Sequence, residues 1–354
     1  MEKKSFTHTL QIQKKLLAWY HQYKRDLPWR QTKDPYAIWV SEMMLQQTQV
    51  KTVIPYYERW IRKFPNVKKL AQAPLDQVLK HWEGLGYYSR ARNLHKGAQW
   101  IVEKYGGRIP QTSKELIELP GIGLYTANAI ASIAFDKDVP VVDGNVKRVL
   151  SRIFLLSNDP GKIYKEAERL LVKGEANSFN QAMMELGATV CMPQNPVCLL
   201  CPIQSDCKAF QQGLQGKYPI AEKRIVQKNI KTFGGLIWKK GKLLIRQRPL
   251  KGLLGGLWEF PTYVTKNGEG TTAYFEHLKK EVQLQIKIGK KIGDFKHIYT
   301  HLIEWLEIYD YEWVEGQIPR TLKKTWVWVS PEKLKDFPFS GICAKVREKV
   351  QNKD

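Results

Sequence analysis

Two predicted helices meet at Leu119-Pro120-Gly121-Ile122-Gly123-Leu124-Tyr125-Thr126-Ala127. Thr112 and Glu115 have the spacing of a capping box, and they open a short predicted helix that ends at the start of this stretch. The next helix is predicted over residues 125–134. The two glycines permit a tight turn in which backbone N–H groups point outward at the start of a helix. Such a turn can bind phosphate without reading base sequence.

The stretch resembles a helix–hairpin–helix motif, which we place at about residues 113–134. A Gly-x-Gly pair alone is weak evidence, and the alternative is an ordinary turn between two helices. The capping box, Pro120 and an acid twenty residues downstream of the second glycine favour the motif. That acid is Asp143, in Val139-Pro140-Val141-Val142-Asp143-Gly144-Asn145-Val146, and by itself it predicts an N-cap for the helix that follows.

Four of the five cysteines fall within seventeen positions, in the loop 191–207. They are Cys191, Cys198, Cys201 and Cys207. Four thiolates on one short loop suit zinc or a [4Fe–4S] cluster, because both take four sulfur ligands. Zinc sites usually show two Cys-x2-Cys pairs, whereas this loop has one such pair with a single cysteine on either side. The spacing therefore favours iron–sulfur over zinc, and Cys343 is predicted to be an unligated thiol.

The first part of the chain, residues 1–216, is predicted to be almost entirely helical. Asp34-Pro35 offers an N-cap followed by a proline at the first helical position. The run Tyr36–Lys51 contains neither Gly nor Pro and repeats its apolar residues with a helical period, which predicts a helix there.

Beyond this part the pattern changes. Residues 217–231 are mostly polar, with five basic residues and one acid, and are interpreted as a basic linker. Residues 232–354 carry a hairpin signal at Lys239-Lys240-Gly241 and alternating segments rich in aromatic and β-branched residues. They are predicted to form a second, α+β domain.

The charge balance is the unusual feature of the composition. Lys and Arg number 57 against 34 Asp and Glu, a formal net charge of +23 over 354 residues. Hydrophobic residues make up 43% and charged residues 26%, as in an ordinary folded protein, which excludes a fibre or a disordered tail. So basic a chain implies a polyanionic partner, either nucleic acid or an anionic membrane surface. Because no apolar run approaches the ~18 residues of a membrane span and the N-terminus lacks the core of a signal peptide, nucleic acid in the cytoplasm or nucleoid is favoured. A monomer is the default expectation.

The cysteine spacing directly after a helical domain resembles the endonuclease III superfamily of DNA glycosylases. In that superfamily the cluster is structural, and the Asp that matches Asp143 is the catalytic carboxylate. In its bifunctional members the position of Tyr125 is a Lys that forms a Schiff base with the sugar. A phenol cannot form an imine, so this chain is expected to release a base without cleaving the strand.

A longer string resembles the adenine DNA glycosylase (MutY) family, which excises adenine mispaired with 8-oxoguanine, and the chain is identified as a member of it. The resemblance covers most of the chain and both domains. It rests on Trp39-Val40-Ser41-Glu42-Met43-Met44-Leu45-Gln46-Gln47-Thr48-Gln49-Val50, on Leu27-Pro28-Trp29-Arg30, on Gly84-Leu85-Gly86-Tyr87-Tyr88-Ser89-Arg90-Ala91-Arg92-Asn93-Leu94, on the hairpin and the cysteines, and on Leu254-Gly255-Gly256-Leu257-Trp258-Glu259-Phe260-Pro261.

The resemblance implies catalytic roles. Glu42, mid-helix in apolar surroundings that would raise its pKa, matches the acid that donates a proton to adenine N7 and later assists the attack of water. Asp143 would stabilise the oxocarbenium-like sugar, as in retaining glycoside hydrolysis. Tyr125 and Asn145 match the positions that orient these two carboxylates.

Chemistry on a base inside a duplex requires that the base be flipped out. By resemblance, Gln47 and Tyr87 match residues that fill or wedge the gap, and Arg30 and Gln181 match residues that face the flipped adenine. The alternative interpretation is helix-end packing for Tyr87 and a solvated polar face for Gln47.

The second domain resembles the Nudix fold of 8-oxo-dGTP pyrophosphohydrolases. Those enzymes hold divalent metals with an acidic helix, but the corresponding residues 276–281 have lost most carboxylates and gained two lysines. The domain is therefore expected to read the 8-oxoguanine opposite the adenine instead of hydrolysing nucleotides. Phe295-Lys296-His297 matches a recognition loop in which the middle position is typically Ser, so Lys296 departs from the pattern while His297 keeps it.

Together these features predict a monofunctional adenine DNA glycosylase of base excision repair. It would carry a [4Fe–4S] cluster and act on double-stranded DNA with A:8-oxoguanine or A:G mispairs. The first alternative is a superfamily relative that acts on mismatched thymine or oxidised pyrimidines. The second is a noncatalytic DNA-binding protein that senses redox state through its cluster. A nucleotide-sanitising hydrolase is disfavoured by the lost acidic helix.

Overall fold

The computed structural model describes residues 2–220, 226–266 and 269–351. None of the helices in these ranges combines the length and the apolar character that crossing a membrane requires.

The chain divides into two compact units. Unit 1 holds residues 1–72 and 93–223, and unit 2 holds residues 73–92 and 224–354. Residues 73–92, called here the α5 segment, thus group with the C-terminal part of the chain, which the sequence did not indicate.

Unit 1 is built from helices. The longer ones are α1 (Glu2–Tyr23), α2 (Pro35–Leu45), α3 (Val50–Lys63), α6 (Ser89–Tyr105), α8 (Leu124–Phe135), α9 (Gly144–Phe154), α10 (Pro160–Leu170) and α11 (Ala176–Thr189). The shorter ones are α4 (Val67–Gln72), α7 (Ser113–Leu116), α12 (Lys208–Gln211) and 3₁₀ turns at Pro28–Arg30, Cys198–Leu200 and Gln204–Asp206. α6 begins in unit 2 and continues into unit 1. The predicted helical character of this part is confirmed.

α2 is surrounded by protein. Nine of its eleven residues are buried, so the helix is apolar on nearly every side, as expected for a helix in the interior. It packs against α3 and α8. Asp34 accepts a hydrogen bond from the Tyr36 N–H at 3.1 Å, and Pro35 is the first helical residue. The predicted N-cap is confirmed.

The predicted helix over Tyr36–Lys51 is wrong in its second half, because α2 and α3 are separate helices. Gln46 leaves the helical region, with a ψ of 111°, and Gln47 has a left-handed backbone with a φ of 57°. The Gln46 side chain donates to Thr126 Oγ1 on α8 at 3.1 Å. A contact with a residue distant in sequence thus helps fix a break that neither Gly nor Pro marks.

The turn between α7 and α8 has the geometry that its glycines predicted. The capping box of Thr112 and Glu115 is complete, and Gly121 has a φ of 76°. A Cβ at Gly121 would collide with the Asn93 side chain, so this position requires glycine for its backbone and for its packing. Gly123 is the N-cap of α8, and no side chain caps this helix.

α9 and α11 belong to a second packed group with α1 and α10, whose apolar faces form one buried cluster. α11 approaches the start of α9 closely at Gly187, where a Cβ would lie 2.6 Å from the Cβ of Asn145. This close approach brings one face of α11 next to the N-terminus of α9.

Unit 2 is an α+β domain, as predicted. Its strands are β1 (Lys228–Lys239), β2 (Lys242–Gln247), β3 (Trp258–Glu259), β4 (Thr262–Val264), β5 (Leu284–Ile298), β6 (Leu302–Gly316) and β7 (Trp326–Val329). They form one sheet in the order β3-β2-β1-β6-β5, with β4 paired to β1 and β7 to β2. β1 and β6 are parallel and the other pairs are antiparallel. Its helices are α5 (Leu75–Trp82), α13 (Thr271–Val282), α14 (Gly341–Gln351) and 3₁₀ turns at Arg320–Leu322 and Pro331–Asp336.

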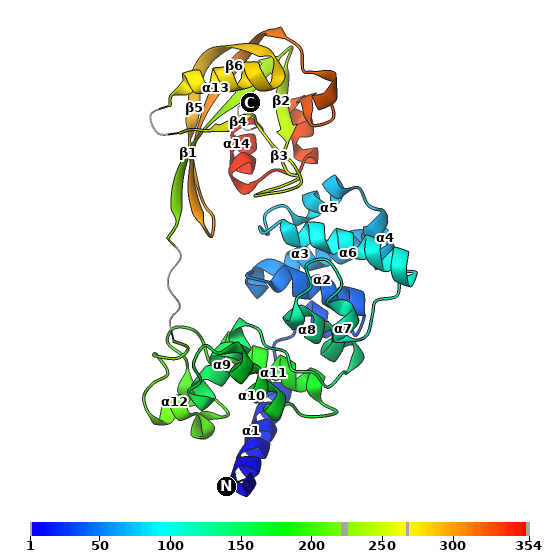
Figure 1. Cartoon of the computed structure of the whole chain (residues 1–354), viewed down its shortest axis with the longest axis vertical. Helices are drawn as coiled ribbons and strands as arrows, with labels where there is room; N and C mark the ends of the chain where they lie inside the picture. Colours follow the sequence, from blue (N-terminus) through cyan, green and yellow to red (C-terminus); the bar gives the residue numbers. More distant parts are fainter. Residues whose placement is uncertain (1, 221–225, 267–268, 352–354) are drawn as a thin grey trace. The chain divides into compact units, whose positions relative to one another are not determined.

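α13 and α14 cover opposite faces of the sheet (Figure 1). Leu236 and Leu243 pack with α14, and their neighbours Ile237 and Leu244 pack with α13, because side chains alternate along a strand.

The predicted β1–β2 hairpin is confirmed, since Lys239 pairs with Lys242. Lys240 and Gly241 have φ values of 48° and 72°, as a type I′ turn requires. β1 begins at Lys228, inside the segment interpreted as a linker, of which residues 221–225 lie outside the described part.

The α5 segment is held to the rest of unit 2 by polar contacts. Asp76 accepts hydrogen bonds from Gln247 Nε2 at 2.9 Å and Trp258 Nε1 at 3.2 Å. Glu83 forms an ion pair with Arg347 at 3.0 Å. These partly buried contacts explain why the segment belongs to unit 2.

Candidate active site

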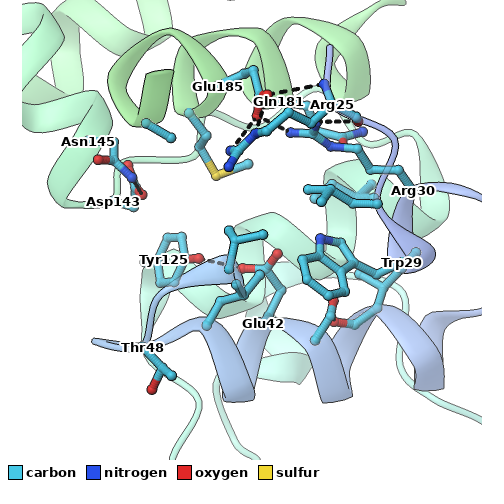
Figure 2. A pocket seen from close by; sticks show the side chains of 18 residues that line it. Arg25, Trp29, Arg30, Glu42, Thr48, Tyr125, Asp143, Asn145, Gln181 and Glu185 are labelled. Atoms are coloured by element: carbon cyan, nitrogen blue, oxygen red, sulfur yellow. Dashed lines mark hydrogen bonds and ion pairs between the residues drawn. The ribbon is translucent and has the colours of Figure 1, made fainter. Parts of the chain in front are cut away.

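Helices α2, α8, α9 and α11 and the turn Pro28–Arg30 border a cavity of about 150 Å³ in unit 1. Six of the residues singled out in the sequence lie around it (Figure 2). They are Arg30, Glu42, Tyr125, Asp143, Asn145 and Gln181. The fold thus gathers groups that are up to 151 positions apart in the chain.

Glu42 is buried in this cavity, with only 5% of its surface exposed. Tyr125, the second residue of α8, donates its hydroxyl hydrogen to Glu42 Oε2 (Figure 2). Burial raises the pKa of Glu42 to about 7, against the opposing effects of Tyr125 and Arg30, and the charge of Asp143 adds to the shift. Glu42 can therefore carry a proton near neutral pH, which suits a general acid.

Asp143 is the N-cap of α9, as predicted. Its Oδ1 accepts the backbone N–H of Val146 at 2.7 Å, and its Oδ2 accepts Asn145 Nδ2 at 2.9 Å. Burial raises the pKa of Asp143, and these two hydrogen bonds oppose the rise because they favour the carboxylate.

Arg148, which the sequence did not single out, connects Asn145 to the cysteine loop. Its Nη2 donates to Asn145 Oδ1 and to Gly187 O, both at 2.8 Å, and its Nε donates to Cys191 O at 2.8 Å. Because the guanidinium has only donors, it holds the amide oxygen of Asn145 and directs the amide NH₂ towards Asp143.

Charged side chains line the side of the cavity that lies opposite Glu42 (Figure 2). Glu185, only 1% exposed, forms ion pairs with Arg25 at 2.6 Å and Arg30 at 2.7 Å. Burial would raise the pKa of Glu185, but the hydrogen bonds from both arginines outweigh it and lower the pKa to about 2. Arg30 Nε also donates to Gln181 Oε1 at 3.1 Å.

Sequence reasoning missed Arg25 and Glu185. The one local signal for Glu185 is its position four residues after Gln181, which places both on one face of α11. Arg25 lies in a connecting loop, and its role becomes visible only when its partner on α11 is known.

Gln47 and Tyr87 do not line the cavity. Both are exposed and both have a left-handed backbone, with φ values of 57° and 47°. A side-chain-bearing residue rarely adopts this conformation, which is often found at functional sites. Gln47 follows α2 in unit 1, and Tyr87 lies in the α5 segment of unit 2.

The four clustered cysteines border a separate cavity of unit 1, together with Arg152. Arg152 is 2% exposed, and its side chain donates to the carbonyl oxygens of Met192, Pro193 and Tyr218 and to Cys191 Sγ at 3.3 Å. Burial raises the pKa of Cys198, Cys201 and Cys207, and the positive charge of Arg152 opposes the rise at Cys198. Cys343 is buried in unit 2, apart from this cavity.

Lys296 and His297 lie on β5 and point to opposite sides of the sheet. Lys296 is exposed, and its Nζ lies 4.4 Å from the ring centroid of Trp305, its neighbour on β6. His297 is half-buried with its ring 4.4 Å from that of Tyr299. Burial and the positive charge of Lys345 lower the pKa of His297, so its imidazole is neutral at pH 7.

Two carboxylates near α13, those of Glu259 and Glu281, are paired with arginines. Arg246 Nε donates to Glu259 Oε1 at 2.8 Å, and its Nη1 lies 3.3 Å from Glu281 Oε2. Arg248 pairs with the other oxygen of Glu259 at 2.6 Å. A guanidinium thus lies between the two carboxylates.

Comparisons with known proteins agree with this architecture. Residues 40–173 match the model of the HhH-GPD superfamily base excision DNA repair protein, and residues 233–349 match that of the NUDIX domain. The adenine DNA glycosylase of Rattus norvegicus is 38% identical to this chain over an alignment of 405 positions, which covers 95% of this chain and 77% of the rat protein.

Two solved structures match the helical part. A thermostable thymine-DNA glycosylase superposes with a TM-score of 0.56 and 29% identity, covering 59% of this chain and 99% of that one. Endonuclease III in a non-covalent complex with DNA superposes with a TM-score of 0.52 and 24% identity, covering 58% of this chain and 98% of that one.

These matches define the protein as a DNA glycosylase of base excision repair. They also confirm the predicted fold class, a helical glycosylase domain followed by a Nudix-like α+β domain. The chain belongs to the adenine DNA glycosylase family. The family resemblance deduced from the sequence is thereby confirmed.

Proposed function

We propose that this enzyme is a monofunctional glycosylase that removes adenine opposite 8-oxoguanine or guanine in double-stranded DNA. The observation that carries the proposal is a buried Glu42, with a pKa of about 7, in one cavity with Asp143. The name of the rat relative, adenine DNA glycosylase, supports adenine as the base that is released.

Glu42 acts first, as the general acid. The adenine anion is a poor leaving group, so protonation of a ring nitrogen, N7 in this proposal, lets the base depart neutral. Tyr125 donates to Glu42 Oε2, which leaves Oε1 to carry the proton towards the base. After the base departs, Glu42 is a carboxylate and assists the attack of water.

Asp143 acts on the sugar. Bond cleavage leaves positive charge on the deoxyribose, and a fixed carboxylate stabilises it, as in retaining glycoside hydrolysis. The hydrogen bonds from Val146 and Asn145 hold Asp143 in place, and Arg148 holds Asn145. Tyr125 cannot form a Schiff base, which supports base release without strand cleavage.

The flipped adenine faces Arg30 and Gln181 in this proposal. Both line the cavity, and they are hydrogen-bonded to each other at 3.1 Å, which fixes donors and acceptors before the base enters. Gln47 and Tyr87 fill the gap that the base leaves. Their exposure and left-handed backbones support a role in contact with DNA.

The turn between α7 and α8 binds a DNA phosphate. Gly121 and Gly123 are exposed, and α8 lacks a side-chain cap, so its first N–H groups suit an anionic acceptor. The net charge of +23 supports nonspecific affinity for the backbone. In unit 2, Lys296 and His297 read the base opposite adenine.

The loop 191–207 holds a [4Fe–4S] cluster through Cys191, Cys198, Cys201 and Cys207. The four thiols border one cavity beside a buried arginine, which fits a negatively charged thiolate cluster. No three His, Cys, Asp or Glu side chains among the described residues are grouped to hold a metal ion. When bound, the cluster cross-links the loop.

Cys198→Ser should abolish the cluster, whereas Cys343→Ser should leave it intact. The measurement is iron and sulfide content together with visible absorbance of the purified enzyme. Four irons per chain are expected in the wild type on the basis of the [4Fe–4S] assignment. Zinc in place of iron, or equal metal content in the Cys198 variant, would contradict the assignment.

The rate of adenine release should fall as pH rises through about 7, because Glu42 must be protonated. Above that pH the single-turnover rate should drop about tenfold per unit, as expected for one titrating acid. Tyr125→Phe removes a donor that lowers the pKa of Glu42, so it should move the midpoint to higher pH. A rate that increases through pH 7 would exclude Glu42 as the acid.

The function itself is tested on duplexes with adenine opposite 8-oxoguanine, guanine, cytosine or thymine, with and without alkali. We expect breaks only after alkali and the fastest reaction opposite 8-oxoguanine. Equal rates opposite guanine would keep the chemistry and show that Lys296 weakens damage recognition, which Lys296→Ser should reverse. Absence of adenine release from every duplex would overturn the proposal.

The second candidate is a glycosylase for mismatched thymine. It is favoured by the 29% identity with the thymine-DNA glycosylase, but that match covers only 59% of this chain. Release of thymine from a T:G duplex, with adenine retained in all others, would establish it.

A further inference from the structure

Asn177 lies in the first turn of α11, one helical turn before Gln181, and contacts it directly. Gln181 Nε2 donates to Asn177 Oδ1 at 2.6 Å. Asn177 does not line the catalytic cavity. It lines an adjoining cavity of about 220 Å³, which Arg30, Ile133 and Gln181 border as well. Asn177 therefore lies behind the residues that face the adenine in the proposed function, and its effect on a bound base passes through Gln181.

Two acceptors fix the direction of the Asn177 amide. Its Nδ2 donates to the backbone oxygen of Ile133 at 3.2 Å and to Asp136 Oδ1 at 3.3 Å. The Ile133 carbonyl belongs to the last turn of α8 and can only accept. The hydrogen bond from Lys33 lowers the pKa of Asp136, so this side chain is a carboxylate and also only accepts. Because both partners are acceptors, the NH₂ group of Asn177 faces them and its oxygen faces Gln181.

The direction of the Gln181 amide follows from its two partners. Its Nε2 donates to the oxygen of Asn177, and its Oε1 accepts from Arg30 Nε at 3.1 Å (Figure 2). A guanidinium has only donors, so the chain of hydrogen bonds from Arg30 to Ile133 has one possible direction. An amide oxygen has two lone pairs and Arg30 uses one of them. Gln181 Oε1 can therefore accept a second hydrogen bond from a base in the catalytic cavity.

We propose that Asn177 is a positioning residue that makes Gln181 present its oxygen to the base, and that it thereby favours adenine over purines with an oxygen at C6. This inference rests on the proposed function, in which Gln181 faces the flipped adenine. The C6 amino group of adenine donates, whereas the C6 oxygen of hypoxanthine accepts. Two facing acceptors stay unpaired, which is costly in a buried site. Without Asn177, turning the Gln181 amide over would cost only its bond with Arg30.

The test compares adenine with hypoxanthine, each placed opposite 8-oxoguanine in the same duplex, by the single-turnover rate of base release. The wild type should release adenine about five- to a hundredfold faster, the range expected for one unpaired buried acceptor. Asn177→Leu keeps the branched shape but removes the acceptor, and it should reduce this ratio about two- to tenfold, the range of one neutral hydrogen bond. The intrinsic reactivities of the two bases are the same for every variant, so a change in the ratio reports on the protein.

Asn177→Asp separates positioning from structural support. Aspartate keeps an oxygen that accepts from Gln181, so the ratio should stay within twofold of the wild-type value. The variant loses the donors to Ile133 O and Asp136 and places two carboxylates together, so its thermal unfolding midpoint should fall. In the Gln181→Leu background, where the amide is already absent, adding Asn177→Leu should change the ratio less than twofold.

Asn158→Leu is the matched control. Asn158 is half-buried in unit 1, lines neither cavity, and donates from Nδ2 to Ile220 O at 2.6 Å. Its replacement removes an amide that also holds a carbonyl, and it should leave the ratio within twofold of the wild-type value.

An unchanged ratio in Asn177→Leu, or an equal change with and without the Gln181 amide, would overturn the inference. So would a loss of preference in Asn177→Asp as large as that in Asn177→Leu, because a purely structural role predicts that result. Each of these results would arise with an enzyme that still releases adenine. An enzyme that releases no adenine from any duplex would instead overturn the proposed function, and this inference with it.

Discussion

Glu42→Gln is expected to slow adenine release by about 10²–10⁴-fold, the contribution that a well-placed general acid makes. Glutamine has the size of glutamic acid and can still accept the hydrogen bond from Tyr125, but it has no proton to give at neutral pH. The measurement is the single-turnover rate on an A:8-oxoguanine duplex, with abasic product converted to breaks by alkali.

Binding separates loss of chemistry from loss of structure. The variant should bind the mispaired duplex at least as well as the wild type, since no negative charge is added to the cavity. Glu58→Gln, on the exposed surface of α3, makes the same side-chain replacement away from the cavity and should leave the rate within twofold. A Glu42→Gln rate within tenfold of the wild type would show that another group protonates the base. The pH dependence through 7 should also disappear in this variant.

Much of the site was predictable because its signals are local. The N-cap at Asp143 and the capping box at Thr112 depend on residues within three positions, and both are present in the structure. The turn at Gly121 depends on backbone freedom that only glycine has, and its φ is positive. The burial of Glu42 followed from the apolar residues around it in α2.

What could not be predicted depends on partners that are distant in sequence. The break after α2 involves Gln46 and Thr126, eighty positions apart. The ion pairs of Glu185 reach back across 155 and 160 positions to the first loops. The α5 segment belongs to unit 2 because of contacts such as Asp76 with Gln247, which no periodicity in either segment indicates.

Asp143→Asn should lower the rate of adenine release by about 10²–10³-fold, the usual cost of losing one electrostatic group that stabilises a transition state. The substitution keeps the structural role of the residue. Asparagine is as good an N-cap as aspartate, and its Oδ1 can still accept the Val146 N–H. The lost quantity is the negative charge beside the sugar.

The same charge also acts on Glu42. Because Asp143 raises the pKa of Glu42, its neutralisation should let Glu42 ionise more easily. The alkaline loss of the remaining activity should therefore begin at lower pH in Asp143→Asn than in the wild type. If Asp143 only capped α9 and had no electrostatic effect on Glu42, the pH midpoint of this loss would be the same in the variant and in the wild type.

Asp159 offers the matched control, since its side chain accepts the N–H groups of Gly161 and Lys162 as the N-cap of α10. Asp159→Asn should keep both stability and the rate of adenine release. Asp143→Ala should lose the rate and, in addition, about 1 kcal/mol of unfolding free energy, because alanine cannot cap α9. If Asp143→Asn kept the wild-type rate while Asp143→Ala lost stability, Asp143 would be only a helix cap. The positive charge on the sugar would then need another counterpart, and Glu42, once deprotonated, is a carboxylate in the same cavity that could supply it.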